Sequence, residues 1–157
     1  MDLESLYSTY AKDVYRYLYS LCTQSFLAED LLQDTFYKAF LHLEDNEIDN
    51  IKAWLFKVAY HTFIDYQRKN KRLLIDGKVE DHLSSDQNTP ETEYIKNEQK
   101  KEIIALMMKL SHYERQSIFL CDFHELKLHE AAEVLGLNLN TLKSHLYRGR
   151  KKLKELL

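Results

Sequence analysis

Residues 128–153 read LHEAAEVLGLNLNTLKSHLYRGRKKL and carry the strongest structural signal in the chain. The spacing of apolar residues predicts a short helix over 129–135, and Gly136 follows where a left-handed residue commonly ends a helix. Asn138 is a favoured N-cap, so a second helix is predicted over 139–156. A short helix, a tight glycine turn and a capped basic helix are typical of a helix-turn-helix.

The last helix separates into an apolar face and a polar face when its residues are placed about 100° apart. We expect the apolar sector to pack against the preceding helices: Leu142, Leu146, Gly149 and Leu153. On a recognition helix, outward residues of the first turns meet base edges, and flanking cations meet phosphates. The outward side chains suited to such contacts are Lys143, Ser144, Tyr147, Arg148 and Lys151, with Thr141 near the groove wall. A basic terminal helix alone is more often a solvated surface, but the glycine turn ahead of this one favours DNA binding.

Charge is distributed in blocks along the 157 residues, although the net charge is only -3. Residues 1–51 carry 3 Lys/Arg and 10 Asp/Glu, whereas residues 52–72 carry 6 and 1. Residues 73–98 carry 2 and 7, residues 99–137 carry 5 and 6, and residues 138–157 carry 6 and 1. Two basic segments, each at the end of a predicted helical region, indicate two surfaces that face anions.

The composition favours helices and excludes several classes of protein. With 1 Pro and 3 Gly against 45% hydrophobic and 30% charged residues, the chain has too few turn formers for a many-stranded β fold. No segment approaches the roughly 20 apolar residues of a membrane span or resembles a signal peptide, so we expect a soluble, cytoplasmic protein. Cys22 and Cys121 suit neither a disulfide framework nor a zinc site and are predicted to be buried thiols.

Three amphipathic helices are predicted before residue 73 and are expected to share one core. Their apolar faces are Leu3, Tyr7, Tyr10, Val14, Leu18 and Leu21; Ala28, Leu32, Phe36, Ala39 and Leu43; and Trp54, Val58, Thr62 and Tyr66. Residues 73–94 contain the single Pro and the run SSDQNTPETE, a composition that predicts a flexible linker of about 25 Å root-mean-square length.

A second domain is predicted over residues 95–157. Its first helix is marked by Ile95, Gln99, Ile103, Leu106 and Leu110. Ser111 and Glu114 have the spacing of a capping box, which predicts the start of a helix over 113–123 ahead of the helix-turn-helix. The fold class is therefore all-α, with two helical domains.

Three segments resemble a known family: AEDLLQDTFYKAF (28–40), KAWLFKVAYHTFIDYQRKNKR (52–72) and the helix-turn-helix at 128–153. Together, in this order, they resemble the two-domain, extracytoplasmic-function (ECF) group of bacterial RNA polymerase sigma factors. The resemblance implies sigma region 2 over residues 2–72 and sigma region 4 over residues 95–157. It also implies that the protein is a transcription initiation factor and not itself an enzyme.

In this family a D-x-x-Q-x-x-F helix docks on the clamp coiled coil of the largest polymerase subunit, and the polymerase flap receives the C-terminal domain. Carried over, the docking motif places Asp30, Gln33 and Phe36, together with Asp34, at that interface. The acidic first block supplies a field complementary to a basic coiled coil. For Phe36, packing in the helical core is the alternative interpretation.

The loop before the third helix captures a flipped-out base of the minus 10 element in the family, and the helix after it supports DNA melting. The resemblance assigns these roles to Glu47, Ile48, Asp49 and Asn50 in the loop and to Lys57, His61, Arg68, Lys69, Lys71 and Arg72 in the helix. Tyr60 and Tyr66 are candidates for stacking on exposed bases. Trp54 resembles a core residue of the family, and His61 stands where the family commonly has Asn.

The second domain corresponds to the part of the family that reads the minus 35 element, which gives that role to the outward residues of the last helix. Two positions depart from the family pattern. Lys127 replaces a capping Ser or Thr, which is expected to weaken that helix end by about 1 kcal/mol. Gly149 replaces a usual Ala. The acidic residues of the linker have two open interpretations: they mimic the negative charge of nucleic acid, or they only increase solubility. These residues are Asp76, Glu80, Asp81, Asp86, Glu91 and Glu93.

The expected partners are core RNA polymerase, promoter DNA and, by resemblance, a membrane-anchored anti-sigma factor, with no direct membrane insertion of this chain. No cofactor, metal or catalytic residue is expected. A stand-alone helix-turn-helix regulator with an N-terminal sensor or dimerisation bundle is the main alternative. The others are a helical enzyme or metal site using His61 and Asp65, or His42 and nearby acids, and an interaction protein such as an anti-activator.

Overall fold

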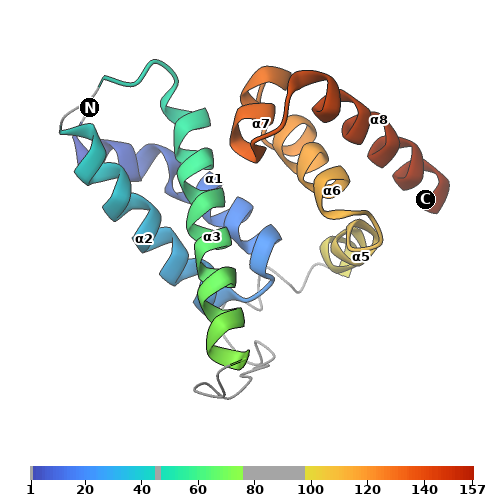
Figure 1. The fold of residues 1–157 in the computed structure, drawn as a ribbon, viewed down its shortest axis with the longest axis horizontal. Coiled ribbons are helices and arrows are strands. Elements are labelled where there is room, and N and C mark those ends of the chain that lie inside the picture. The colour runs from blue at the N-terminus through green and yellow to red at the C-terminus, as the bar shows by residue number, and fades with distance from the viewer. Residues whose placement is uncertain (1, 45–46, 76–97) are drawn as a thin grey trace. The chain divides into compact units, whose positions relative to one another are not determined.

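A computed structural model of the chain describes residues 2–44, 47–75 and 98–157 (Figure 1). Within these residues every regular element is a helix, which confirms the predicted all-α class. The helices form two compact units, α1 to α3 and α5 to α8. Most of the predicted linker lies outside the described residues, as do all six of its acids. No helix in the described part of the chain is long and apolar enough to cross a membrane.

The first unit is a three-helix bundle in which each helix packs against the other two. Its elements are α1 (Leu3–Cys22), α2 (Ser25–Leu43) and α3 (Ile51–Ile75). The Asp2 side chain caps α1 by accepting a hydrogen bond of 2.8 Å from the Ser5 N–H. Helix α3 ends at residue 75 and so includes the first three residues of the predicted linker, 73 to 75.

The buried faces of α1 and α3 differ from those predicted. On α1, Val14 and Leu18 are fully buried as predicted and Leu6 and Tyr17 are buried with them, while the predicted core residues Leu3 and Tyr7 are exposed. On α3 the core is formed by Leu55, Phe56, Ala59, Tyr60, Thr62 and Phe63, whereas Tyr66 is exposed and Trp54 and Val58 are only half-buried. Periodicity selects one stripe of residues, but the positions of the two neighbouring helices determine which residues of that stripe, and which beside it, are buried. On α2, burial of Ala28, Leu32, Phe36 and Ala39 confirms the predicted face.

The second unit contains α5 (Glu98–Met107), α6 (His112–Ile118), the π-helical turn η1 (Phe119–Phe123), α7 (Leu128–Leu135) and α8 (Leu139–Leu156). The predicted capping box is present: the Glu114 N–H donates to Ser111 Oγ at 3.3 Å, and the Ser111 N–H donates to Glu114 Oε1 at 3.0 Å. Gly136 has a φ of 68°, the left-handed conformation expected of it. Asn138 caps α8 by accepting from the Thr141 N–H at 2.8 Å. The predicted helix-turn-helix is confirmed.

The π-helical turn was not predicted. The expected α-helix over 113–123 ends at Ile118, and the His124 N–H then donates to the Phe119 carbonyl at 3.0 Å, five residues back. This wider turn contains Asp122, whose carboxylate binds Arg150 of α8. The Asp122–Arg150 contact joins segments 28 residues apart, which a local sequence pattern does not reveal.

The start of α7 is stabilised in a way that partly offsets the missing Ser or Thr cap. Lys127 has no side-chain acceptor, but its N–H donates to Glu130 Oε1 at 2.8 Å. This bond is the Glu half of a capping box. The expected destabilisation of the start of α7, about 1 kcal/mol for the missing Ser or Thr cap, is therefore an upper limit.

The core of the second unit is built by Met107, Leu110, Ile118, Phe119 and Leu146, with Cys121 and Leu153 packed against it. Both cysteines are half-buried, not buried as predicted. Burial, together with the neighbouring Asp122 carboxylate, raises the pKa of the Cys121 thiol to about 11. Cys121 therefore stays a neutral thiol at physiological pH.

Gly149 allows α8 to approach α6 closely. A Cβ built there would lie 3.0 Å from the Glu114 carbonyl oxygen and 3.0 Å from Ile118 Cδ1. We expect Gly149→Val to destabilise the second unit by about 1–3 kcal/mol, because the branched side chain must push the two helices apart. Chemical unfolding followed by circular dichroism measures this change. Lys154→Val, at an exposed position of the same helix, is the control and should change stability by less than about 0.5 kcal/mol.

Candidate polymerase and nucleic-acid interfaces

The outward face of α2 presents three of the four residues assigned to polymerase binding. Asp30, Gln33 and Asp34 are exposed. Phe36 is only 4% exposed, and its ring packs edge-to-face on Tyr7 with a centroid distance of 5.0 Å. Because Phe36 fills the core of the bundle, its burial supports the core interpretation, and a role for its side chain at the polymerase interface stays a prediction.

The same face of α2 also presents apolar side chains that the sequence analysis missed. The exposed ones are Phe26, Tyr37, Phe40 and Leu41. With Asp30 and Gln33 they follow the spacing 26, 30, 33, 37 and 40 or 41, which places them on one side of a helix. The same spacing in the sequence indicates a second row of apolar residues, on the outward face of the helix. Exposed apolar groups interleaved with polar ones are typical of a protein-binding surface.

The loop assigned to the minus 10 element is exposed but is not wholly free to bind a base. Glu47, Asp49 and Asn50 are exposed, and Ile48 is half-buried. Asn50 Oδ1 accepts a hydrogen bond from the Ala53 N–H at 3.2 Å and so caps α3. Asn50 therefore has a structural role at the loop–helix junction.

Helix α3 presents a cationic surface toward its C-terminal end. His61 is exposed and Lys57 is half-buried; further along the helix Arg68, Lys69, Lys71 and Arg72 are exposed. Arg68 lies 4.0 Å from Asp65, an exposed pair of little energetic weight that leaves the arginine able to meet phosphate.

The aromatic residues of α3 divide between core and surface. Tyr60 is 6% exposed, so the interpretation that it stacks on DNA bases is wrong for this structure, whereas Tyr66 is exposed. Trp54 is half-buried and stacks on His42 with a centroid distance of 5.4 Å. This packing is consistent with the structural role assigned to Trp54.

Helix α8 turns its predicted reading residues outward. Lys143, Ser144, Tyr147, Arg148 and Lys151 are exposed and Thr141 is half-buried. Leu142, Leu146 and Gly149 are buried on the opposite side, as predicted, and Leu153 is half-buried. Asn140, which was not among the predicted reading residues, is exposed in the first turn and lies at helical spacing from Ser144, Tyr147 and Lys151.

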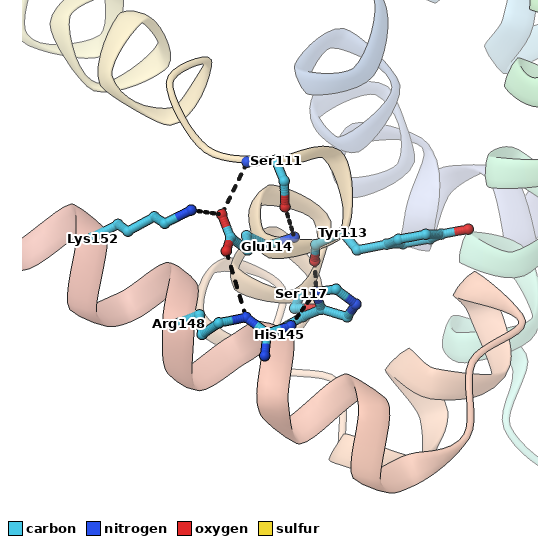
Figure 2. A network of polar contacts seen from close by, with 7 residues as sticks. All are labelled: Ser111, Tyr113, Glu114, Ser117, His145, Arg148 and Lys152. Carbon is cyan, nitrogen blue, oxygen red and sulfur yellow. Dashed lines mark hydrogen bonds and ion pairs between the residues drawn. The ribbon is translucent and has the colours of Figure 1, made fainter.

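A buried carboxylate joins α6 to one flank of α8 (Figure 2). The Glu114 side chain is 4% exposed, and Lys152 Nζ donates to its Oε1 at 3.0 Å while Arg148 Nε lies 3.8 Å from its Oε2. Burial raises the pKa of Glu114, but the Ser111 N–H and Lys152 lower it by more, so the net pKa lies below its usual value. The group is ionised at neutral pH. Arg148 also lies within hydrogen-bonding distance of His145, with its guanidinium 3.2 Å from Nδ1.

The other flank of α8 is held by a second ion pair. Arg150 Nε donates to Asp122 Oδ2 at 3.0 Å, and a second guanidinium nitrogen donates to Oδ1. This two-point hydrogen bond raises the pKa of Arg150. Thus Arg148, Arg150 and Lys152 contact carboxylates of the protein itself, whereas Lys143 and Lys151 point outward.

The enzyme alternative gains no support from the described residues. His61 and Asp65 are both exposed and one helical turn apart. No group of three or more His, Cys, Asp or Glu side chains that could hold a metal ion occurs within the described parts of the chain.

Comparison with known proteins identifies the family. Residues 6–73 match the family model for Sigma-70 region 2, and residues 100–153 match that for Sigma-70, region 4. The ECF RNA polymerase sigma factor SigM of Bacillus subtilis (strain 168) is 35% identical over 158 residues, which cover 99% of this chain and 95% of SigM. The RNA polymerase sigma factor YlaC of the same organism is 31% identical over 158 residues, covering 98% of this chain and 91% of YlaC.

The fold and these matches define a sigma factor of the sigma-70 family. Within that family, the chain belongs to the ECF group of RNA polymerase sigma factors. It is a transcription initiation factor that binds RNA polymerase and directs it to specific promoters, and the alternative of a stand-alone regulator is not favoured.

Two solved structures share the fold. The sigma factor RpoE from Bartonella quintana, in complex with the anti-sigma factor NepR, has a TM-score of 0.77 at 24% identity, over 98% of this chain and 94% of that one. CnrH, in complex with the cytosolic domain of CnrY, has a TM-score of 0.70 at 23% identity, over 98% of this chain and 86% of CnrH.

Proposed function

We propose that the two units divide the work of promoter recognition. Residues 2–72 bind core polymerase and open the minus 10 region, residues 73–94 link the units, and residues 95–157 read the minus 35 element. The observation that carries this proposal is α8, whose exposed polar face lies opposite a buried leucine face in a capped helix-turn-helix. The chain supplies binding energy that selects and melts DNA, and RNA synthesis is catalysed by the polymerase.

Polymerase docking is assigned to the outward face of α2. Asp30, Gln33 and Asp34 supply hydrogen-bond acceptors and negative charge for the clamp coiled coil of the largest subunit. The exposed aromatic rings of Tyr37 and Phe40 on the same helix supply apolar area. The second unit binds the polymerase flap.

Minus 10 recognition is assigned to the loop before α3 and to the cations of α3. Glu47, Ile48 and Asp49 line the site for an extruded base, and Asn50 holds the loop on the helix. Extrusion of a base costs a few kcal/mol, which contacts in such a site must offset. The exposed cations at the C-terminal end of α3, with Lys57 and His61 nearer its start, bind the strands as they separate.

Minus 35 recognition is assigned to α8. Thr141, Ser144 and Asn140 offer neutral hydrogen-bonding groups near the helix start, and Lys143 and Lys151 offer cations. Tyr147, which is 68% exposed, offers apolar contact. Arg148, on the flank of the helix, offers a further cation.

Alanine substitution on α8 separates DNA reading from polymerase binding. We expect Lys143→Ala or Arg148→Ala to lower promoter-dependent initiation by about 5- to 100-fold, the equivalent of one good base contact. Co-elution with core polymerase should be unchanged. Run-off transcription and gel filtration measure the two effects, with Lys154→Ala as a control at the far end of α8. Loss of polymerase binding by either variant would refute the division of roles.

An anti-sigma protein is proposed as a further partner, in a cytoplasmic setting. RpoE, which shares the fold, was solved in complex with the anti-sigma factor NepR, and CnrH, which also shares it, was solved in complex with the cytosolic domain of CnrY. We propose that a membrane-anchored protein holds this chain inactive in the same manner. Co-purification of the tagged chain from membranes tests this.

Run-off transcription with purified bacterial core polymerase and a pooled promoter library is the direct test of the proposed function. Addition of the chain should give transcripts from templates that share a minus 10 and a minus 35 sequence. A stand-alone regulator would instead bind its operator tightly without polymerase. Absence of any chain-dependent transcript from every template would overturn the proposal.

A further inference from the structure

The carboxylate of Glu114 is not among the groups assigned to direct contact with polymerase or with DNA. It lies at the start of α6, almost wholly buried, and contacts two cations of the recognition helix α8 (Figure 2). Lys152 Nζ donates a hydrogen bond to it at 3.0 Å, whereas Arg148 Nε forms an ion pair with it at 3.8 Å and the Arg148 guanidinium also lies 3.2 Å from His145 Nδ1. Both cationic side chains are about half-exposed, so DNA phosphates can reach them from the solvent side.

These contacts bear on how the helix distinguishes one DNA sequence from another. Affinity for any DNA comes mostly from Lys and Arg contacts to phosphates, which carry no sequence information. A cation that is free to move can follow a phosphate on every duplex. A cation held by a buried carboxylate meets a phosphate or base only where the docked geometry brings that group to it.

We propose that Glu114 is a positioning residue that sets the specificity of minus 35 recognition without touching DNA. By holding Arg148 and Lys152 on the flank of α8, it restricts their use to the correctly docked complex and lowers affinity for other sequences. The proposal rests on the proposed function, in which α8 reads the minus 35 element.

The capping role of Glu114 can be separated from this effect. Its Oε1 accepts the Ser111 N–H at 3.0 Å, and Gln serves as well as Glu at this position of a capping box. Glu114→Gln therefore keeps one acceptor oxygen and the side-chain shape, while it removes the charge and replaces the other carboxylate oxygen by an NH2 group. Glu155→Gln is the matched control, because it changes the net charge equally at an exposed site of α8 itself.

The experiment measures binding of the full chain to two fluorescent duplexes between 50 and 200 mM salt. One duplex carries the minus 35 sequence selected by run-off transcription and the other a scrambled sequence. For Glu114→Gln on the scrambled duplex, the slope of log affinity against log salt should steepen by about 0.9 to 1.8, equal to one or two more phosphate contacts. Affinity for that duplex should rise roughly fivefold at low salt. Affinity for the minus 35 duplex should change less than about twofold, so the ratio between the two falls.

A merely structural role for Glu114 predicts a different result. It would weaken binding to both duplexes together and would not steepen the salt dependence. If the wild type prefers the minus 35 duplex while Glu114→Gln leaves slope and ratio unchanged, the inference is wrong and the proposed function stands. If the wild type shows no preference between the two duplexes, the assignment of minus 35 reading to α8 is wrong and the inference that rests on it is wrong as well, whereas run-off transcription tests separately whether the chain is an initiation factor. Glu155→Gln should match the wild type within about twofold.

A second pair of variants keeps the test decisive if Glu114→Gln unfolds. Arg148→Ala and Lys152→Ala change exposed side chains, and on the scrambled duplex each should alter the salt slope by less than about 0.3, because the native side chains are held by Glu114. Arg148→Ala should lower affinity only for the minus 35 duplex. A loss of about 0.9 in slope for either variant on scrambled DNA would show a freely moving cation and overturn the inference.

Discussion

Asp30→Arg combined with Gln33→Ala is expected to weaken binding to core polymerase by about 100-fold or more. Both residues are exposed on the outward face of α2, and neither packs in the bundle. Reversing a charge opposite a basic coiled coil costs several kcal/mol, and loss of the amide removes a hydrogen bond at the same surface. Gel filtration of the variant with core polymerase, or titration of a fluorescent chain, measures the loss.

Two further variants test whether the loss of binding is specific to the outward face of α2. Asp13→Arg makes the same charge change on α1 and should leave polymerase binding within about twofold of the wild type. Tyr37→Ala tests the apolar part of the same α2 surface and should weaken binding about tenfold, as expected for an exposed aromatic ring at an interface. Undiminished co-elution of the double variant would show that the docking surface lies elsewhere.

The elements that were predictable from sequence are those fixed by neighbouring residues. Gly136 and Asn138 mark the turn between α7 and α8, and Ser111 with Glu114 marks the start of α6; all four behave as local rules require. The outer face of α8 was predictable for the same reason, since one period of 3.6 residues determines it.

The features that were not predictable depend on residues far apart in the sequence. Glu114 and Lys152 are 38 residues apart, and Asp122 and Arg150 are 28 apart. Nothing in a local pattern pairs them. The buried faces of α1 and α3 depend on where their two neighbouring helices lie, and Tyr60, a candidate for stacking on exposed bases, is found in the core.

Leu146→Asp is expected to unfold the second unit and abolish promoter-dependent transcription. Leu146 is 4% exposed and packs with Met107, Leu110, Ile118 and Phe119. Removing a buried Leu side chain costs about 2–5 kcal/mol, and a buried, unpaired carboxylate adds to that cost. A helical unit of this size has a stability of only about 3–5 kcal/mol, so the sum exceeds it.

The first unit should remain folded in this variant because it has a core of its own, built around residues such as Leu6, Tyr17 and Phe56. Circular dichroism should then lose roughly the helical signal of the second unit, while the α2 surface still binds core polymerase, more weakly for lack of the flap contact. Lys154→Asp places the same acid at an exposed site of α8 and should keep the full helical signal. A single transition that melts all helices together would mean that the second unit supports the first. Retained binding by the variant would locate the docking surface in α1 to α3 independently of any substitution on α2.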